Sequence, residues 1–367
     1  MERLSIPGRP ISETESQSCR RAAGLLGALL GFALTAAGGE AALARAPARP
    51  VSIERRILAM GTVLDVQLVA KNRAQGLEQS EIAAAEIRRI EDLLTTWKPG
   101  SPLDLLNRAP VGRPVPVDSE LLGLLETVLD WAQRTGGAFD PTVLPLVTCW
   151  GLRAQGRVPG ADELARARRA VGPGAFRLDA AHGAASRLLQ AAGFDEGAWA
   201  KGYALDRASA RLRDSGVQGA LLNLGGQVLT SGRDLEGRPW RVGIADPRQR
   251  RRIALAIDAS GLSVSTSGNS ERSKTAGGRT IGHLLDPRTG QPAPDFGSAT
   301  VIARSGLLAD VLSSACFVLG PQRGLALSEE LRRQGIDQEV IFLVARAGEP
   351  SVIASPGARA LLSGDRR

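Results

Sequence analysis

Short apolar segments bounded by glycine-rich polar turns alternate with longer amphipathic segments through most of this chain of 367 residues. Short apolar runs between turn residues are typical of strands. The candidate strands lie at residues 53–69 (interrupted at Gly61), 220–224, 241–244, 253–257, 262–265, 300–303 and 339–345. Helices interleaved with such strands predict an α+β or mixed α/β fold with mostly antiparallel or mixed sheets, and not a doubly wound nucleotide-binding fold.

Apolar positions spaced by three and four residues predict the helices. One face of the helix predicted at residues 77–97 consists of Ala83, Ile87, Ile90, Leu94 and Trp97. The helix predicted at residues 119–134 has Asp118 or Ser119 as its N-cap and Gly136 as its C-terminal stop. Further helices are predicted at residues 161–170, 203–213 and 309–319.

The first 44 residues have the pattern of an export signal. Arg20 and Arg21 precede a weakly apolar run from Ala22 to Ala37, and Ala42-Leu43-Ala44 supplies a small-residue cleavage site. We therefore predict a cleavable signal (1–44), a linker (45–52), one large domain (53–350) and a C-terminal tail (351–367). The mature protein would be periplasmic, exported by the Sec or the twin-arginine route. An uncleaved membrane anchor is the alternative interpretation.

The net charge of +8 does not depend on the predicted signal, because residues 1–44 contain four arginines and four glutamates. Arg248 and the run Arg250–Arg252 form one basic cluster ahead of a candidate strand. It predicts a solvated hairpin tip, with docking to an anionic membrane surface as the alternative. The chain lacks the helical or aromatic-lined basic motifs of nucleic-acid-binding proteins.

Cys149 and Cys316 are the cysteines that remain after residue 44. They are too few for a disulfide framework, and their spacing indicates neither a zinc nor an iron–sulfur site. A disulfide bond between them stays open at this stage.

Lys201 stands at the predicted start of a helix, within the stretch from Asp195 to Tyr203. Anions are stabilised there by unpaired backbone donors and by the positive end of the helix dipole. A contact with a phosphate-bearing ligand is the functional interpretation, and an ordinary surface lysine is the alternative. The chain has neither a G-x-x-x-x-G-K-[ST] motif nor a strand-linked G-x-G-x-x-G motif, which argues against ordinary NTPases and dinucleotide dehydrogenases.

Asp310 and Ser314 are four residues apart in a predicted helix, so their side chains share one face. A carboxylate and a hydroxyl suit Mg²⁺, which prefers oxygen ligands and keeps waters or substrate phosphates for its remaining positions. The alternative is structural: an aspartate near a helix N-terminus and a serine bonded to a carbonyl of the preceding turn.

His283 is one of two histidines and opens the segment His-Leu-Leu-Asp-Pro-Arg-Thr-Gly290. Histidine can accept or donate a proton near neutral pH. The turn built by Asp286, Pro287 and Gly290 would hold its side chain at a defined place. His283 is therefore a candidate general base, and a histidine that merely ends a strand is the alternative.

These features belong to an ordered series of motifs that resembles the ApbE family of flavin transferases over roughly residues 51 to 350. The series comprises Met-Gly-Thr at 60–62, Phe-Asp-Pro-Thr-Val at 139–143, Asp195 through Lys-Gly-Tyr203 to Asp206, Asn-Leu-Gly-Gly at 223–226, Thr-Ser-Gly at 266–268, His-Leu-Leu-Asp-Pro-Arg-Thr-Gly at 283–290 and Ala-Asp at 309–310 ahead of Leu-Gly at 319–320. Each motif is weak alone, but the whole series in this order is specific.

The resemblance implies an ApbE-like fold with two lobes around an FAD cleft. The residues that it implies for the FAD site are Met60, Trp97, Ala138, Phe139, Asp140, Asp195, Lys201 and Leu285. It implies that Mg²⁺ lies between the Ala198 carbonyl, Asp310 and Ser314, with His283 as the catalytic base.

The chain departs from the family pattern at the implied metal site. The family often has threonine where this chain has Ser314. Some members carry a further aspartate at Ser313 and a side-chain hydroxyl at Ala198. The resemblance therefore implies a lower affinity for Mg²⁺ than in members that keep these side chains.

The implied reaction is Mg²⁺-dependent transfer of FMN from FAD to a Thr or Ser hydroxyl of an exported flavoprotein subunit, with release of AMP. The acceptor would be a flavin-accepting subunit of a membrane electron-transfer complex. Two alternatives stay open: an FAD pyrophosphatase that yields FMN and AMP, and a non-enzymatic periplasmic FAD-binding protein.

Overall fold

The computed structural model describes residues 49–269 and 273–362. The chain divides after Ala46, and every described residue belongs to the unit Pro47–Arg367. The predicted export signal and the first part of the predicted linker lie outside the described residues.

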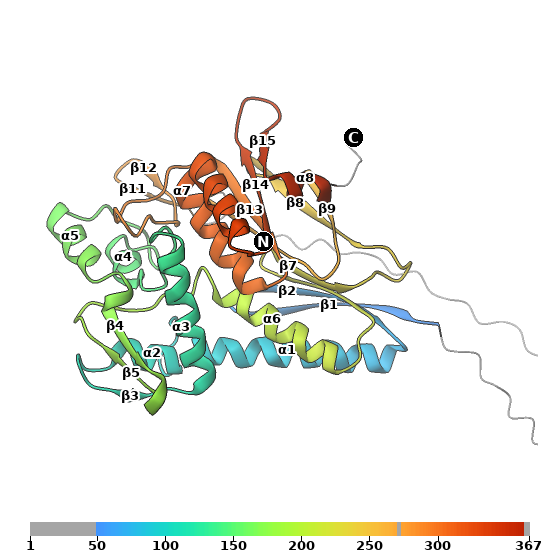
Figure 1. Ribbon diagram of the computed structural model, residues 1–367, viewed down its shortest axis with the longest axis horizontal. Helices are drawn as coiled ribbons and strands as arrows, with labels where there is room; N and C mark the ends of the chain where they lie inside the picture. Colours follow the sequence, from blue (N-terminus) through green and yellow to red (C-terminus); the bar gives the residue numbers. More distant parts are fainter. Residues whose placement is uncertain (1–48, 270–272, 363–367) are drawn as a thin grey trace, which may run out of the picture. The chain divides into compact units, whose positions relative to one another are not determined.

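An antiparallel sheet of eight strands forms the centre of this unit (Figure 1). Its strands are β1 Val51–Ala59, β2 Thr62–Ala70, β6 Gly219–Leu224, β7 Gln227–Gly232, β10 Ser263–Gly268, β13 Gly297–Ala303, β14 Gln338–Val344 and β15 Ser351–Ala354. Their order across the sheet is β1-β2-β6-β7-β10-β13-β14-β15, and every neighbouring pair is antiparallel.

Side chains of the central strands alternate between two cores, as the two-residue period of a strand requires. In β13, Val301 packs in the larger core and Ile302 in a smaller one. In β14, Phe342 packs in the larger core and Ile341 in the smaller one. All four side chains are buried, so the sheet is covered on both faces.

Three helices cover the face of the larger core (Figure 1). They are α1 Arg73–Leu94, α6 Ala200–Asp214 and α7 Gly306–Arg333. The Asn72 side chain caps α1 by accepting the N–H of Gln75. Helix α7 is kinked at Gly320, whose φ of 76° lies in the left-handed region, directly before Pro321.

A β-hairpin and a short helix cover the opposite face. These elements are β8 Trp240–Asp246, β9 Gln249–Ala259 and α8 Pro356–Leu361. Val242 and Ile257 of the hairpin are buried against the sheet. The basic cluster lies in the turn and the start of β9, where Arg252 pairs with Glu349, which confirms the predicted hairpin tip.

The remaining elements lie together on one side of the main sheet in Figure 1. The helices are α2 Pro102–Arg108, α3 Ser119–Arg134, α4 Leu144–Cys149 and α5 Ala161–Arg169, with two 3₁₀ turns at Pro173–Ala175 and Ala180–His182. The strands are β3 Val115–Pro116, β4 Phe176–Asp179 and β5 Ala184–Arg187, with a small ribbon of β11 Lys274–Ala276 and β12 Arg279–Ile281.

The helix predicted at residues 77–97 is wrong at its C-terminal end. Helix α1 stops at Leu94, and Thr95 is extended with ψ of 125°. The backbone N–H and the hydroxyl of Thr96 both donate to the Glu196 carboxylate, which draws the chain out of the helical path. Trp97 therefore lies beyond the helix and is 62% exposed instead of packing on its inner face.

The α+β prediction is confirmed, because helices and antiparallel sheets make up the unit. Ser351–Ala354 forms the edge strand β15, so the segment predicted as a tail contributes a strand and α8. Cys149 and Cys316 are both buried and free, and no disulfide joins them.

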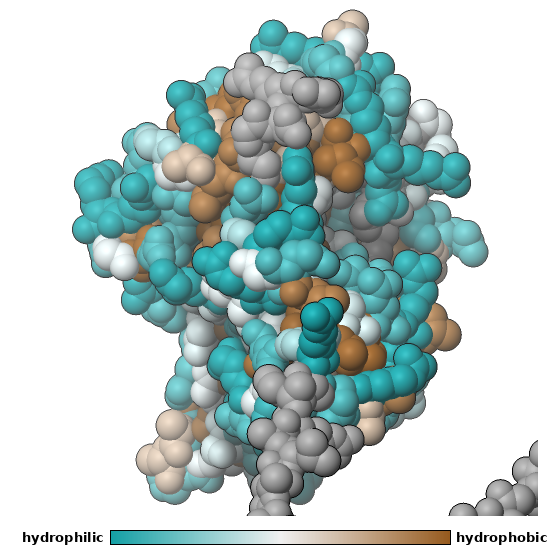
Figure 2. All heavy atoms as spheres, turned by 90° about the vertical axis from the view of Figure 1, so that its right-hand side faces the viewer, coloured by the Kyte–Doolittle hydropathy of each residue, from teal (hydrophilic) through white to brown (hydrophobic). Residues whose placement is uncertain are grey.

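Hydrophilic side chains predominate on the face seen in Figure 2, and hydrophobic groups occur there as separate small patches. Among the described residues, the most exposed large hydrophobic side chains are Leu58 and Ile253, at 82% and 66%. Within residues 49–269 and 273–362, no helix is long and apolar enough to cross a membrane.

Candidate functional site

Asp310 and Ser314 lie one turn apart in the N-terminal half of α7, as their spacing predicts. Both are largely buried, at 4% and 7% exposure. Oδ2 of Asp310 accepts the N–H of Gly202 at 3.1 Å and lies 3.5 Å from Nζ of Lys201. A buried carboxylate needs hydrogen-bonding and cationic partners, and the start of α6 supplies both.

Hydroxyl groups of β10 face the same stretch of α7. Because side chains alternate along a strand, Ser265 and Ser267 point toward α7 while Thr266 points away. Oγ of Ser267 lies 3.3 Å from Oγ of Ser314, and Oγ of Ser265 lies 3.5 Å from Oδ1 of Asp310. The site thus contains a carboxylate surrounded by hydroxyl oxygens.

Lys201 is the second residue of α6, and its ammonium group points toward Asp310. Its side chain is 25% exposed, which does not match the alternative of an ordinary surface lysine. The cation and the first N–H groups of α6 lie at the same end of the helix. This arrangement can bind an anionic group such as a phosphate.

The oxygen atoms around Asp310 suit a hard divalent cation. Mg²⁺ is commonly held by one or two carboxylates together with substrate phosphates. Ala198 lies in the turn before α6, and its carbonyl is the acceptor that Gly202 N–H would reach in a continuous helix; that N–H goes to Asp310 instead. Among the described residues, no group of three or more His, Cys, Asp or Glu could hold a metal. A cation at Asp310 would therefore need further oxygens, from hydroxyl or carbonyl groups or from a ligand.

Ser313, the neighbour of Ser314, is fully buried. Its hydroxyl lies 3.0 Å from the Asp310 carbonyl and 2.9 Å from Oγ of Ser267. Ser313 therefore links α7 to Ser267 of β10 from within the core.

His283 follows the short strand β12 and is half-buried. A β-carbon on Gly282 would lie 2.4 Å from the Asn269 side-chain amide, so the backbone before His283 packs directly on Asn269. Asn269 stands two residues after Ser267, which contacts Ser314. Packing thus joins the His283 segment to the strand that carries the serine hydroxyls.

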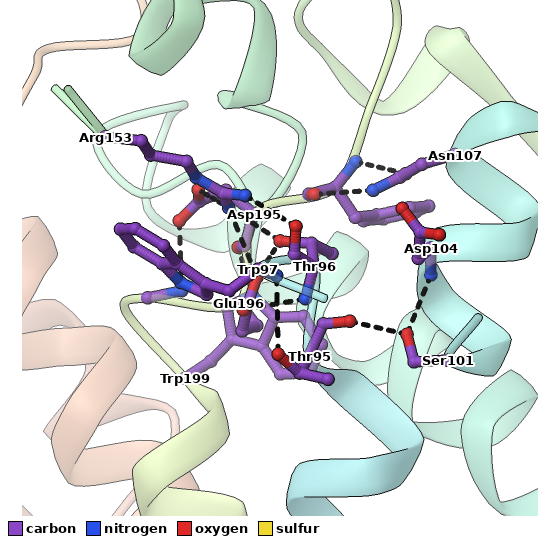
Figure 3. Close-up of polar contacts among 12 residues, drawn as sticks. Thr95, Thr96, Trp97, Ser101, Asp104, Asn107, Arg153, Asp195, Glu196 and Trp199 are labelled. Carbon is purple, nitrogen blue, oxygen red and sulfur yellow. Dashed lines mark hydrogen bonds and ion pairs between the residues drawn. The ribbon is translucent and has the colours of Figure 1, made fainter. Parts of the chain in front are cut away.

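A second cluster centres on Arg153 and contains Trp97 and Asp195. The guanidinium carbon of Arg153 lies 4.7 Å from the centroid of the Trp97 ring, a cation–π contact. Nη2 of Arg153 lies 2.5 Å from Oδ2 of Asp195 and 2.6 Å from the Thr96 hydroxyl. Figure 3 shows Arg153 reaching over Trp97 toward Asp195 and Thr96.

Glu196 brings a second carboxylate to this cluster, with Oε2 3.5 Å from Nη2 of Arg153. Burial and the neighbouring Asp195 raise the pKa of Glu196, while hydrogen bonds from Thr96 act in the opposite direction. Trp199 closes the cluster by donating its indole N–H to the Asp195 carbonyl at 2.8 Å. Asp195 and Glu196 stand five and four residues before the first residue of α6, so this cluster lies near the Lys201 end of the helix.

The predicted segment Ala138–Asp140 packs beside the same region. Its three residues are buried. Asp140 accepts two hydrogen bonds from Thr142, and burial raises its pKa. The N–H of Asp195 donates to the Pro141 carbonyl at 2.8 Å, which ties this segment to the Arg153 cluster.

Met60 and Leu285, which the resemblance also implies for the FAD site, have other surroundings than Trp97, Asp195 and Lys201. Met60 adopts a left-handed φ of 50° in the turn between β1 and β2, and its N–H donates to Glu91 near the end of α1. Leu285 packs in a small core with Leu146 and Trp150. The contacts of the described residues therefore connect Leu285 to α4 and not to the Asp310 site.

The sequence interpretation assigned no role to Arg153, Ser265 or Ser267. Ser265 ends the candidate strand at 262–265, and Ser267 lies in the Thr-Ser-Gly motif at 266–268. The alternation of side chains along a strand is the signal that could have paired both serines with α7. Arg153 is a single arginine after Trp-Gly-Leu and carries no such signal.

The model that represents the ApbE family matches residues 60–338. This chain belongs to the ApbE family. The FAD:protein FMN transferase of Klebsiella pneumoniae is 30% identical over 351 residues, which cover 92% of this chain and 97% of that protein. The FAD:protein FMN transferase of Rhodobacter capsulatus is 34% identical over 347 residues, covering 94% of this chain and 64% of that protein.

Solved ApbE structures have the same fold. The apo flavinyl transferase ApbE of Pseudomonas stutzeri superposes with a TM-score of 0.73 at 29% identity, covering 85% of this chain and 97% of that one. The ApbE protein of Thermotoga maritima gives a TM-score of 0.77 at 27% identity, with 85% and 99% coverage. These findings confirm the resemblance drawn from the motif series.

Proposed function

We propose that this ApbE-family protein transfers FMN from FAD to a hydroxyl group of an acceptor protein and releases AMP. The supporting observation is that Lys201, near the start of α6, has its ammonium group 3.5 Å from the carboxylate of Asp310 on α7. Serine hydroxyls lie around this pair. A phosphate-binding helix end beside a buried carboxylate suits a substrate that contains a pyrophosphate. Relatives named FAD:protein FMN transferase support this choice of substrate and product.

FAD would extend from the start of α6 to the Arg153 cluster. Lys201 and the first N–H groups of α6 would bind its pyrophosphate. Trp97 is 62% exposed although Arg153 covers one face of its ring, so aromatic surface remains for a planar ring of FAD. Asp195 and the segment Ala138–Asp140 would line this end of the substrate.

Asp310, Ser314 and the Ala198 carbonyl would hold Mg²⁺. Bound there, the metal would neutralise charge that develops on the pyrophosphate oxygens. Lys201 would supply a second positive charge to the same oxygens. Ser267 would hold the Ser314 hydroxyl, since their oxygens lie 3.3 Å apart.

His283 would act as the general base. It takes the proton of the acceptor Thr or Ser hydroxyl while the hydroxyl oxygen attacks the phosphorus on the FMN side of the pyrophosphate. The bond from this phosphorus to the oxygen bridging to AMP breaks, and AMP leaves with the bonding electron pair. The FMN phosphate is then joined to the acceptor as a phosphoester.

A labelling assay tests the proposal. The protein is incubated with FAD, Mg²⁺ and an exported flavoprotein domain that carries an acceptor Thr or Ser. We expect a fluorescent acceptor band in a denaturing gel and one AMP for each acceptor labelled. AMP without a labelled acceptor would favour the pyrophosphatase alternative, and bound FAD with neither product would favour a carrier protein.

We further propose that the protein works in the periplasm after loss of residues 1–44, on a subunit of a membrane electron-transfer complex. The Arg20-Arg21 pair, the apolar run and the Ala-Leu-Ala site support export. Fractionation of cells that produce the full chain tests this: we expect a shortened form that begins near Arg45 in the periplasmic fraction. A full-length form in the membrane fraction would favour the uncleaved anchor.

Replacing Arg153 with methionine is expected to weaken FAD binding by about tenfold. The change removes a cation–π contact worth about 0.5–2 kcal/mol and leaves Asp195 and Glu196 as neighbouring carboxylates without their shared cation. Titration of FAD by fluorescence quenching measures the effect. Arg134→Met is the matched control, because Arg134 lies 5.5 Å above the Trp131 ring on α3 and contacts none of the site residues named above. Equal affinities for all three proteins would refute a role of Arg153 at the FAD site.

A further inference from the structure

The N-terminal ends of α6 and α7 cap each other. Asp206 of α6 accepts the N–H of Gly306 at 2.6 Å and the N–H of Leu307 at 3.0 Å, at the start of α7. Asp310 of α7 accepts the N–H of Gly202 at 3.1 Å, near the start of α6. Each carboxylate therefore satisfies backbone donors that the other helix leaves unpaired, and lies at the positive end of that helix dipole.

The two helix ends also touch through glycine. A β-carbon on Gly202 would lie 2.2 Å from the Gly306 carbonyl oxygen, and one on Gly306 would lie 2.5 Å from the Gly202 carbonyl oxygen. Asp206 follows Gly202 by four residues, and Asp310 follows Gly306 by four residues. Each helix therefore places its capping aspartate about one turn after the glycine at the contact. Gln227 of β7 donates to the Gly306 carbonyl at 2.8 Å and anchors the contact to the sheet.

The two aspartates differ in what else they contact. Asp310 lies 3.5 Å from Lys201 and faces the serine hydroxyls, so it belongs to the site itself. Asp206 contacts none of the proposed ligands. Its third hydrogen bond comes from the Ser305 hydroxyl at 2.7 Å, and Ser305 caps α7 by accepting the N–H of Leu308.

Asp206 thus binds three consecutive residues of the chain where α7 begins, one turn before Asp310. A helix is rigid over one or two turns, so the height and rotation of its first turn determine where the next side chains lie. Movement of this first turn would move Asp310 and Ser314 together with respect to Lys201.

We propose that Asp206 is a positioning residue for the metal site: it holds the first turn of α7 so that Asp310 and Ser314 present their oxygens beside the start of α6. The inference rests on the proposed role of Asp310 and Ser314 as Mg²⁺ ligands. It adds a residue that contacts neither metal nor substrate but determines the affinity for the metal.

The test is metal binding by the full-length protein without turnover. Binding of Mn²⁺, used as the probe ion for the Mg²⁺ site, is followed by electron paramagnetic resonance and by competition with Mg²⁺. We expect Asp206→Asn to weaken Mn²⁺ binding by about tenfold or more, as is typical when groups that orient metal ligands are changed. Gly306 N–H and Leu307 N–H bond different oxygens of Asp206, so the NH₂ group of asparagine, which only donates, would face one of these two donors.

Asp118→Asn is the matched control. Asp118 caps α3 by accepting the N–H of Glu120 at 2.8 Å, and it lies outside both clusters. Asparagine caps helices about as well as aspartate, so this variant is expected to keep the cap of α3, to lose only a negative charge at a helix start, and to bind Mn²⁺ like the unchanged protein. Equal weakening by both variants, or unchanged binding by Asp206→Asn, would overturn the inference.

Ser305→Ala provides a second variant if Asp206→Asn folds poorly. It removes one partner of Asp206 and keeps both backbone hydrogen bonds, so we expect a smaller loss of Mn²⁺ affinity in the same direction. Unchanged affinity in this variant would count against the inference. Asp310→Asn distinguishes the ligand role of Asp310 from the positioning role of Asp206. If Asp310→Asn leaves Mn²⁺ binding intact, the proposed ligand set itself fails. If Asp310→Asn loses Mn²⁺ binding and Asp206→Asn does not, only the positioning role fails.

Discussion

Replacing His283 with alanine is expected to slow FMN transfer to the acceptor by about 10²–10⁴-fold, the usual contribution of a general base. The variant loses the group that removes the proton of the attacking hydroxyl, but it keeps Lys201, Trp97 and Arg153. FAD affinity should therefore stay within about twofold of the unchanged protein. Initial rates of acceptor labelling at saturating FAD, together with a separate FAD titration, measure the two quantities.

His182 provides the control for this prediction, because it is the other histidine of the chain. It is exposed and pairs with Asp179, three residues away, in a 3₁₀ turn next to β4 and β5. We expect His182→Ala to label the acceptor at the normal rate. Normal labelling by His283→Ala would remove His283 from the mechanism, and loss of FAD binding would instead indicate that it holds the substrate.

Replacing Asp310 with asparagine is expected to reduce Mg²⁺-dependent labelling by about 10²-fold or more. A catalytic metal contributes several kcal/mol of charge stabilisation, and about 1.4 kcal/mol corresponds to a tenfold change in rate. The neutral amide also leaves the ammonium of Lys201 without its carboxylate partner 3.5 Å away. The labelling rate as a function of Mg²⁺ concentration measures the effect.

Ser314→Ala should give a smaller effect of the same kind, because it removes one neutral ligand and keeps the carboxylate. Helix α7 should remain folded in both variants, since Ser305 and Asp206 still cap it. Thermal unfolding followed by circular dichroism checks this. An unchanged Mg²⁺ titration for Asp310→Asn in a folded protein would contradict the ligand role.

Local sequence patterns predicted most of the regular elements of this fold. The N-cap Asp118 and the stop at Gly136 bound α3 as expected, because capping depends on residues that are adjacent in the chain. The periodicity of α1 failed at its end, where Thr96 binds Glu196 one hundred residues away. Short elements, such as β3 with two residues and α2 with seven, span too few residues for a repeating period to be visible.

The order of the motifs in the sequence was sufficient to identify the family and to name Lys201, Asp310, Ser314 and His283 as candidates. Motifs consist of neighbouring residues, so they can be read without a fold. The side-chain types also predicted the chemistry: oxygen ligands for a hard cation and an imidazole for proton transfer.

Only the tertiary structure showed which of these residues meet. The order β7-β10-β13 brings Ser267 of β10 beneath α7, and the crossing of α6 and α7 joins Lys201 to Asp310 and Asp206 to Gly306. Arg153 likewise reaches Trp97 and Asp195 from a loop after α4. The physical reason is that these contacts join residues tens to more than a hundred positions apart, so they depend on how the sheet orders its strands and where the helices cross, which no local pattern encodes.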